Sequence, residues 1–249
     1  MIHPALPPGP VAIAHRGGSL EAEENTMEAF AYAVGLGFLD IETDVHATRD
    51  GVAVIHHDPT LARMTGDRRA IAEMDWSEVA RVRTHRGAAI PRVDEALASF
   101  PDVRFVFELK AQAAAEALAP ALRGAPLGRV AVGGVDPRHT ARARALLGEG
   151  LLWSPGRAGV LGLWLGAWGV PAPRPAFRVM HVPPAFRGIP VVTPRFVKAA
   201  ARQGVAVQVW TVDAEAEMER FLDMGVHGVM TDRPSVLREV MRRRGVWAG

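Results

Sequence analysis

Three carboxylates and a lysine stand at two-residue spacing in two apolar segments of the chain. Glu42 and Asp44 close one segment, and Glu108 and Lys110 close another. Residues two apart on a strand point to the same face. Three carboxylates that meet there would repel one another and raise each other's pKa, and a divalent cation relieves that repulsion. Oxygen ligands suit Mg²⁺ or Ca²⁺, so we expect a metal site; the alternative is that each carboxylate is a solvated strand end or pairs with an arginine.

A second group combines histidines with glycines and an arginine. In His15-Arg16-Gly17-Gly18, the glycines let backbone amides approach an anion closely, and the arginine offers a bidentate fork to phosphate oxygens. The alternative is a turn that contains a hydrogen-bonded histidine. His57 follows another histidine before Asp58 and is either functional or part of a loop pair.

The lysine and the remaining histidines lead to different expectations. Lys110 is one of only two lysines among 29 basic residues, which favours a point-charge role at a phosphate because an ammonium differs from a planar guanidinium. We expect the other histidines to be structural or exposed: His3, His46, His85, His139, His181 and His227.

The elements that must position these groups alternate between apolar strands and helices. The expected strands are Val11–Ala14, Phe38–Asp44, Arg104–Glu108, Val130–Gly133, Leu151–Trp153, Phe177–Val182, Val205–Trp210 and Gly228–Thr231. The expected helices are Asn25–Gly37, with Asn25 as N-cap and Glu28 at N3, Val93–Phe100, Ala114–Leu122, Pro137–Leu147, Pro194–Gln203, Ala214–Met224 and Ser235–Arg244.

Buried strands that alternate with helices predict a parallel sheet covered on both faces. Eight such units in 249 residues favour an α/β fold, the TIM (β/α)₈ barrel, over an open sheet, and no Gly-x-Gly-x-x-Gly follows an early strand. In a barrel, chemistry gathers at the C-terminal ends of the strands. His15, Glu42, Glu108, Trp210 and Asp232 are expected at or just after such ends.

One stretch interrupts this alternation. After Val52–Ile55 comes a long segment with charged loops and a short helix expected at Trp76–Arg83. We interpret residues 58–92 as a small insertion after strand 2 and residues 1–249 as one domain.

Composition excludes several classes. The chain has no cysteine, which excludes disulfides, zinc ribbons, iron–sulfur clusters and thiol nucleophiles. The net charge is +2 without a basic stripe, so no nucleic-acid partner is expected. The longest charge-free run, Ala158–Pro173, contains glycines and prolines, which argues against membrane insertion. We expect a cytoplasmic protein.

At this point the chain resembles a known family, the glycerophosphodiester phosphodiesterases. The motifs that carry the resemblance are His15-Arg16-Gly17, Glu24-Asn25-Thr26, Glu42-Thr43-Asp44-Val45, His57-Asp58-Pro59-Thr60-Leu61, Ile90-Pro91, Phe107-Glu108-Leu109-Lys110, Val209-Trp210-Thr211-Val212-Asp213 and Gly228-Val229-Met230-Thr231-Asp232-Arg233-Pro234. They stand in the family's order from about residue 11 to 240. Small departures are Glu23, Asp213 and His227, where the family more often has Pro, Asn and Asp.

The resemblance implies a (β/α)₈ barrel that hydrolyses a small-molecule substrate, a glycerophosphodiester. The implied products are sn-glycerol 3-phosphate and an alcohol, and the implied cofactor is a divalent cation, Mg²⁺ or Ca²⁺. Its implied roles are metal ligands at Glu42, Asp44 and Glu108, an acid–base pair at His15 and His57, and phosphate or substrate contacts at Arg16, Lys110 and Trp210. Which histidine is the acid, and whether water or the glycerol 2-hydroxyl attacks phosphorus, stay open, as do the alcohol and the oligomeric state.

Two alternatives accompany this interpretation. One is a phosphodiesterase of the lysophospholipase D type, in which apolar residues form a lip for lysophospholipids: Val160, Leu161, Leu163, Trp164, Leu165 and Trp168. The same residues also suit a barrel helix that buries one face. The other alternative is a barrel that binds phosphodiesters without hydrolysing them.

Overall fold

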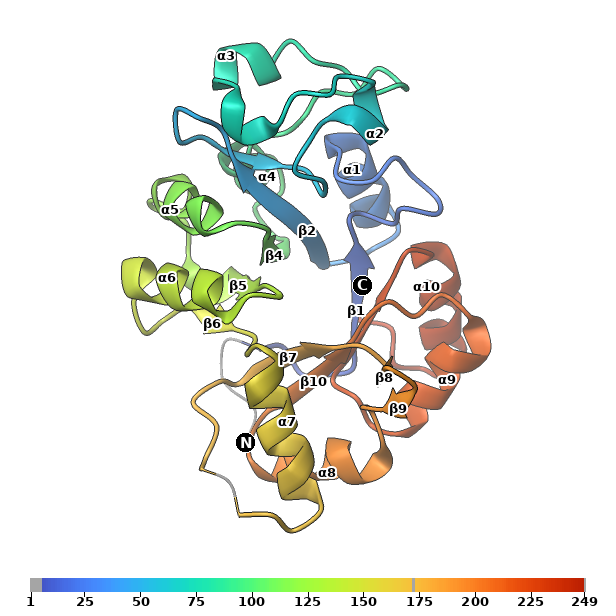
Figure 1. The fold of residues 1–249 in the computed structure, drawn as a ribbon. Coiled ribbons are helices and arrows are strands. Elements are labelled where there is room, and N and C mark those ends of the chain that lie inside the picture. The colour runs from blue at the N-terminus through green and yellow to red at the C-terminus, as the bar shows by residue number, and fades with distance from the viewer. Residues whose placement is uncertain (1–5, 172, 249) are drawn as a thin grey trace.

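Eight parallel strands form a nearly closed barrel in the computed structural model, which describes residues 6–171 and 173–248 (Figure 1). Around the barrel the described strands are β1 (Val11–His15), β2 (Asp40–Ala47), β4 (Arg104–Leu109), β5 (Val130–Gly133), β6 (Leu152–Trp153), β7 (Val179–Val182), β10 (Ala206–Val209) and β11 (Gly228–Thr231). Pairing of β1 with both β2 and β11 joins the two ends of the chain. The predicted fold class is confirmed.

A helix follows each of these strands and packs outside the barrel. The helices are α1 (Met27–Gly35), α4 (Val93–Ser99), α5 (Gln112–Ala121), α6 (Pro137–Leu147), α7 (Arg157–Ala167), α8 (Pro194–Arg202), α9 (Glu215–Asp223) and α10 (Pro234–Arg243). The core lies between the helices and the sheet, where fully buried aromatic rings such as Phe30, Phe105 and Phe107 pack edge-on or stacked. Among the described residues, no helix has the length and apolarity needed to span a bilayer.

The barrel has a seam between β6 and β7, which form no ladder with each other in the described part of the chain. A side chain bridges this seam instead: the backbone N–H of His181 donates a hydrogen bond to Oγ of Ser154 at 2.9 Å. This contact joins β7 to the residue that follows β6.

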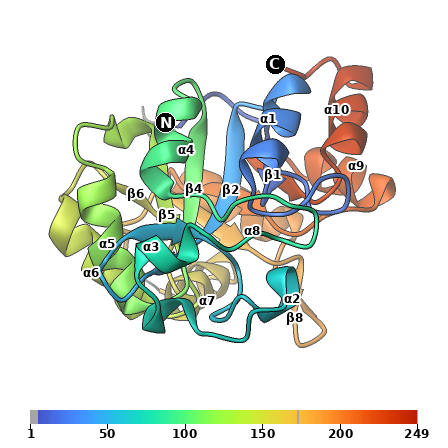
Figure 2. The same cartoon turned by 90° about the horizontal axis from the view of Figure 1, so that it is seen from above.

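The segment after β2 begins with β3 (Ala53–Ile55), which pairs antiparallel with β2. It continues through α2 (Ala62–Thr65), the 3₁₀ turn η1 (Ile71–Glu73) and α3 (Trp76–Val79). Buried side chains, among them Val54, Leu61 and Ile71, give it a small core of its own. Figure 1 shows α2 and α3 at the top of the view, above β2, and in Figure 2, which is seen from above, they lie toward the viewer. The expected helix at Trp76–Arg83 is shorter, since it ends at Val79.

The first helix corrects one expectation. Asn25 is not the N-cap: Thr26 is, because its Oγ accepts a hydrogen bond from the backbone N–H of Ala29. Asn25 adopts the left-handed conformation with φ +59°, which asparagine tolerates better than most residues. That conformation frees its amide for a contact inside the barrel, described below.

The apolar segment around Val160 forms α7, the barrel helix that was one of the two interpretations of these residues. A hairpin of β8 (Ala185–Phe186) and β9 (Ile189–Pro190) precedes α8 and was not expected. Both central residues of the hairpin turn, Arg187 and Gly188, have positive φ, as a tight two-residue turn requires.

Candidate active site

The predicted carboxylate cluster forms at the C-terminal end of the barrel. Glu42, Asp44 and Glu108 each offer a carboxylate oxygen, and these atoms lie within 4.8 Å of one another. The sheet register explains the meeting, because Asp44 pairs with Glu108 across β2 and β4. Residues in register on neighbouring parallel strands bring their side chains to the same side of the sheet.

Asp44 lies at the centre of a charged network and is fully buried. Nζ of Lys110 lies 2.8 Å from its Oδ1, and Nε of Arg16 lies 3.1 Å from its Oδ2. The amide of Asn25 donates to Oδ2 at 2.8 Å. Burial tends to raise the pKa of Asp44, but Lys110 and Arg16 outweigh it, and the pKa is lowered. Asp44 is therefore a carboxylate at neutral pH.

The pKa of Glu42 is shifted in the opposite direction from that of Asp44. Burial is the largest influence on its pKa and, together with the negative charges of Asp44 and Glu108, raises the pKa to about 8. Burial and repulsion from the neighbouring carboxylates thus both disfavour a charged Glu42. A hard divalent cation bound by these oxygens would relieve both effects, so the donor set fits Mg²⁺ or Ca²⁺.

His15, at the end of β1, is fixed between two carboxylates. Its Nδ1 lies 2.6 Å from Oδ1 of Asp232, and its Nε2 lies 3.6 Å from Oε2 of Glu42. Burial tends to lower the pKa of His15, yet Glu42 and the hydrogen bond with Asp232 more than offset it, and the pKa is raised. With Nδ1 engaged by Asp232, Nε2 is the nitrogen left to exchange a proton with a ligand.

His57, just beyond β3, has a similar arrangement. Its Nδ1 lies 2.8 Å from Oδ1 of Asp58. Arg63 holds that carboxylate through its other oxygen at 2.6 Å and also pairs with Glu24 at 2.6 Å. Asp58 and Arg63 of the insertion therefore tie His57 to the loop that follows β1.

The turn after β1 requires glycine. Arg16 has φ +54° and Gly17 has φ +83°. A Cβ on Gly17 would lie 2.7 Å from Cβ of Ala29, closer than real Cβ atoms approach other atoms. The close packing of this turn on α1 places the Arg16 side chain over Asp44.

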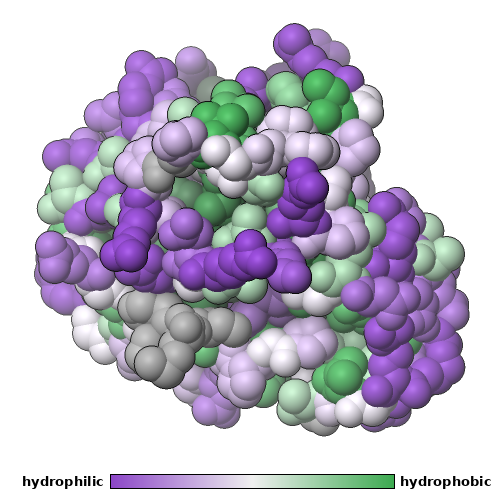
Figure 3. Space-filling model, turned by 90° about the horizontal axis from the view of Figure 1, so that it is seen from below, coloured by the Kyte–Doolittle hydropathy of each residue, from purple (hydrophilic) through white to green (hydrophobic). Residues whose placement is uncertain are grey.

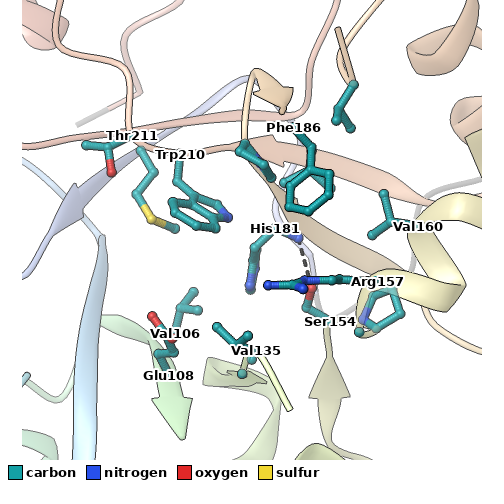
Figure 4. A pocket seen from close by; sticks show the side chains of 18 of the residues that line it. Val106, Glu108, Val135, Ser154, Arg157, Val160, His181, Phe186, Trp210 and Thr211 are labelled. Atoms are coloured by element: carbon teal, nitrogen blue, oxygen red, sulfur yellow. Dashed lines mark hydrogen bonds between the residues drawn. The ribbon is translucent and has the colours of Figure 1, made fainter. Parts of the chain in front are cut away.

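These groups open into a pocket of about 740 Å³. All predicted site residues except the fully buried Asp44 line it: His15, Arg16, Glu42, His57, Glu108, Lys110 and Trp210. In Figure 4, Glu108 lies at one end of the pocket and Val160 and Phe186 at the other, with His181 and Trp210 between them. The indole of Trp210 is partly exposed and is available for contact with a bound molecule.

Sequence reasoning missed several participants. Asp232 was noted after the last strand but given no role, and Asn25 was placed as a cap rather than on Asp44. His181 was expected to be structural or exposed, whereas it lines the pocket and its Nε2 has no hydrogen-bond partner in the described residues. Burial lowers the pKa of His181 to about 4, so this imidazole is neutral. His3 lies outside the described residues.

Comparison with known proteins agrees with this geometry. The profile of the glycerophosphoryl diester phosphodiesterase family matches residues 15–149 and 160–236. A probable glycerophosphodiester phosphodiesterase 2 of Mycobacterium tuberculosis (strain ATCC 25618 / H37Rv) is 39% identical over 249 residues, which cover 97% of this chain and 94% of that protein. The lysophospholipase D GDPD1 of Mus musculus is 25% identical and covers 92% of this chain and 85% of its own length.

Solved structures share the fold. The glycerophosphoryl diester phosphodiesterase domain of a Mycobacterium tuberculosis protein superposes with a TM-score of 0.80 at 22% identity and covers 94% of this chain and 99% of its own. An Oleispira antarctica phosphodiesterase, solved in complex with the product sn-glycerol-3-phosphate, superposes with a TM-score of 0.77 at 20% identity, with 94% and 97% covered.

Proposed function

Because the chain belongs to the glycerophosphoryl diester phosphodiesterase family, we propose that it hydrolyses glycerophosphodiesters to sn-glycerol 3-phosphate and an alcohol. The observation that carries this proposal is the meeting of two histidines, three carboxylates and two cations around one pocket. Their chemistry matches a phosphodiester, which is a monoanion that must accept further negative charge as it reacts.

Glu42, Asp44 and Glu108 are the residues that hold the divalent cation in this proposal. Their oxygens fit a hard cation, and burial together with the charges of Asp44 and Glu108 raises the pKa of Glu42, an effect that a bound cation opposes. When bound, the cation supplies Lewis-acid stabilisation of charge on the phosphoryl oxygens.

Arg16 and Lys110 contact the phosphate. Both cations lie over Asp44 and line the pocket. A guanidinium offers two parallel donors and an ammonium a point charge, so the two side chains hold non-bridging oxygens in a fixed orientation. Trp210 packs against the organic part of the substrate.

His15 and His57 exchange the protons. One accepts a proton from the attacking oxygen as that oxygen bonds to phosphorus. The other donates a proton to the alkoxide as the bond from phosphorus to the alcohol oxygen breaks, which releases a neutral alcohol. With water as the attacking group, the second product is sn-glycerol 3-phosphate; with the glycerol 2-hydroxyl, it is a cyclic phosphate that a water molecule then opens to sn-glycerol 3-phosphate. Each transfer takes place at Nε2, because Nδ1 of both rings faces a carboxylate. Each contributes about 10²–10⁴-fold to the rate.

A substrate panel tests the proposal. Glycerophosphocholine, glycerophosphoethanolamine and glycerophosphoglycerol are incubated with the protein and Mg²⁺, Ca²⁺ or chelator, and sn-glycerol 3-phosphate is measured. Release with a cation and its loss with chelator are expected, and absence of product under every condition would refute the proposal. A transient cyclic phosphate in the reaction indicates attack by the glycerol 2-hydroxyl, and its absence indicates attack by water.

We also propose that residues 1–249 act as one domain, with the insertion at 58–92, in the cytoplasm. The insertion supports this view because its Asp58 holds the ring of His57 and its Arg63 pairs with Glu24. Limited proteolysis that releases separate stable halves, or activity found in a membrane or extracellular fraction, would contradict it.

A further inference from the structure

Arg157 is a cation of the pocket that has no carboxylate partner. It begins α7 and lines the same pocket as Glu108 and Lys110. The other guanidinium and the ammonium of the pocket are both paired. Arg16 contacts Asp44, and Lys110 contacts both Asp44 and Glu108. Arg157, in contrast, forms neither an ion pair nor a hydrogen bond with another residue that the structure describes. Its positive charge is therefore available to a ligand.

The position of Arg157 distinguishes it from an ordinary surface charge. Figure 3 shows hydrophilic residues spread over the side of the molecule where α7 and α8 lie in Figure 1, and such residues need no partner. Figure 4 shows the Arg157 side chain directed into the pocket, toward His181. The centre of its guanidinium lies 5.2 Å from the ring of Phe186, a distance at which a cation and an aromatic ring attract each other. The hairpin thus holds this guanidinium at the wall of the pocket.

The charges around Arg157 favour an anionic ligand group. The carboxylates among the described lining residues of the pocket are Glu42 and Glu108, and both belong to the proposed cation site. Burial lowers the pKa of His181 to about 4, so the neighbouring imidazole is uncharged at neutral pH. The partner that would balance the charge of Arg157 is therefore missing from the described wall of the pocket, and a ligand can supply it.

A second cavity gives such a group room beside Arg157. This cavity of about 770 Å³ meets the pocket along residues that include Glu108, Lys110 and Arg157. The other charged residues of its described wall are already joined in pairs, because Arg138 contacts Asp136 and Lys110 contacts Glu108. Arg157 is again the cation left without a partner. The junction of the two cavities therefore suits a negatively charged group that extends from a ligand in the pocket.

We propose, on the basis of the proposed function, that Arg157 binds a second anionic group of the substrate, a phosphate monoester or a carboxylate carried by the alcohol. A guanidinium offers two parallel donors to either group. Arg157 lies in residues 150–159, which the family profile leaves unmatched. The alcohol is the part that differs among glycerophosphodiesters, so a residue outside the shared profile is a suitable determinant for it. The chain thereby selects phosphodiesters whose leaving alcohol is itself negatively charged.

The test compares three glycerophosphodiesters that differ only at the far end of a linear three-carbon alcohol, which carries a hydroxyl, a phosphate monoester or a carboxylate. Release of sn-glycerol 3-phosphate is measured at low ionic strength. For at least one anionic substrate kcat/KM is expected to be about tenfold higher than for the neutral one, and added salt should reduce this advantage. The substrate that responds identifies the anionic group. Equal or lower values for both anionic substrates would overturn the proposal.

Variants locate the effect. Arg157→Gln is expected to bring the ratio of anionic to neutral kcat/KM close to one. Arg157→Glu is expected to bring it below one, and a glutamate is well tolerated in the first turn of a helix. Arg187→Gln is the matched control: the Arg187 guanidinium lies 5.5 Å from the same Phe186 ring, but the residue does not line the pocket. Equal ratios in Arg157→Gln and Arg187→Gln would show that net charge alone matters and would sink the proposal.

A binding measurement separates this proposal from the proposed function. Affinities for propane-1,3-bisphosphonate and propylphosphonate, which are not hydrolysed, are measured by calorimetry. The bisphosphonate is expected to bind about tenfold more tightly to the wild type, and Arg157→Gln is expected to lose this preference. The same preference without hydrolysis of any substrate would refute the proposed function and keep the anion site. Hydrolysis of glycerophosphocholine together with equal affinities for the two phosphonates would do the reverse.

Discussion

Nδ1 of His15 lies 2.6 Å from Oδ1 of Asp232, although 217 residues separate them in the chain. The pairing of β1 with β11 explains the contact, because Ala14 is in register with Thr231 and the next residue of each segment follows at the barrel rim. A carboxylate at Nδ1 holds the ring in one orientation and favours the tautomer with its proton on that nitrogen. Asp232 is thus a positioning residue for His15.

Replacement of Asp232 tests this role. Asp232→Asn is expected to lower kcat by about tenfold to a hundredfold, less than the loss of His15 itself, since general acid–base groups contribute about 10²–10⁴-fold. KM for glycerophosphocholine is expected to stay near the wild-type value, and the pH–rate profile to shift. In the double variant with His15→Ala, the second change should have little further effect. Asp223→Asn serves as control because Asp223 pairs with exposed Arg244; an additive loss in the double variant would contradict the coupling.

His57 lies immediately before the insertion, whose Asp58 contacts its ring. His57→Ala is expected to reduce kcat/KM for glycerophosphocholine by about 10²–10⁴-fold, because one of two proton transfers is lost. His85→Ala, an exposed histidine of the same insertion, is expected to keep wild-type kinetics. Steady-state assays with matched circular dichroism spectra check both variants, and a fully active His57→Ala would remove this residue from the mechanism.

Cation binding has a readout that does not depend on turnover. A cation at about a hundred times its Kd stabilises the folded state by about 2.7 kcal/mol, which raises Tm by about 5–10 °C in a chain of this size. Titration of chelated protein with Mg²⁺ or Ca²⁺ is expected to show this rise. Glu108→Gln should reduce it strongly, while the exposed Glu116→Gln should not. Equal shifts in the two variants would place the cation elsewhere.

The buried imidazole of His181 makes stability depend on pH. Burial lowers its pKa to about 4, against about 6.5 in an unfolded chain. Between these values the unfolded state binds more protons, so stability falls as pH falls from about 6.5 to 4. The loss attributable to His181 between pH 7 and pH 5 is about 2 kcal/mol. Urea unfolding at the two pH values is expected to show a smaller difference for His181→Gln than for the wild type, and an equal difference would contradict the assignment.

Much of the fold followed from local patterns. Strands such as Val130–Gly133 and Gly228–Thr231 have the predicted bounds, because a short apolar, β-branched run between turn residues identifies a strand from the local sequence alone. Less was predictable between β6 and α8. The short strands β8 and β9 lack a buried face, and their residues are exposed, so hydrophobic periodicity could not reveal the hairpin.

The sequence by itself determined the alternation of strands and helices, and with it the end of the barrel at which Glu42, Asp44 and Glu108 meet. Their two-residue spacing and position at strand ends were sufficient, because parallel strands share a direction. Only the tertiary structure decided which groups complete the site: Asp232 on His15, Asn25 on Asp44 and His181 in the pocket. Those contacts join segments that are distant in the chain. They depend on sheet register and barrel closure, which the local hydrophobic periodicity of the sequence does not specify.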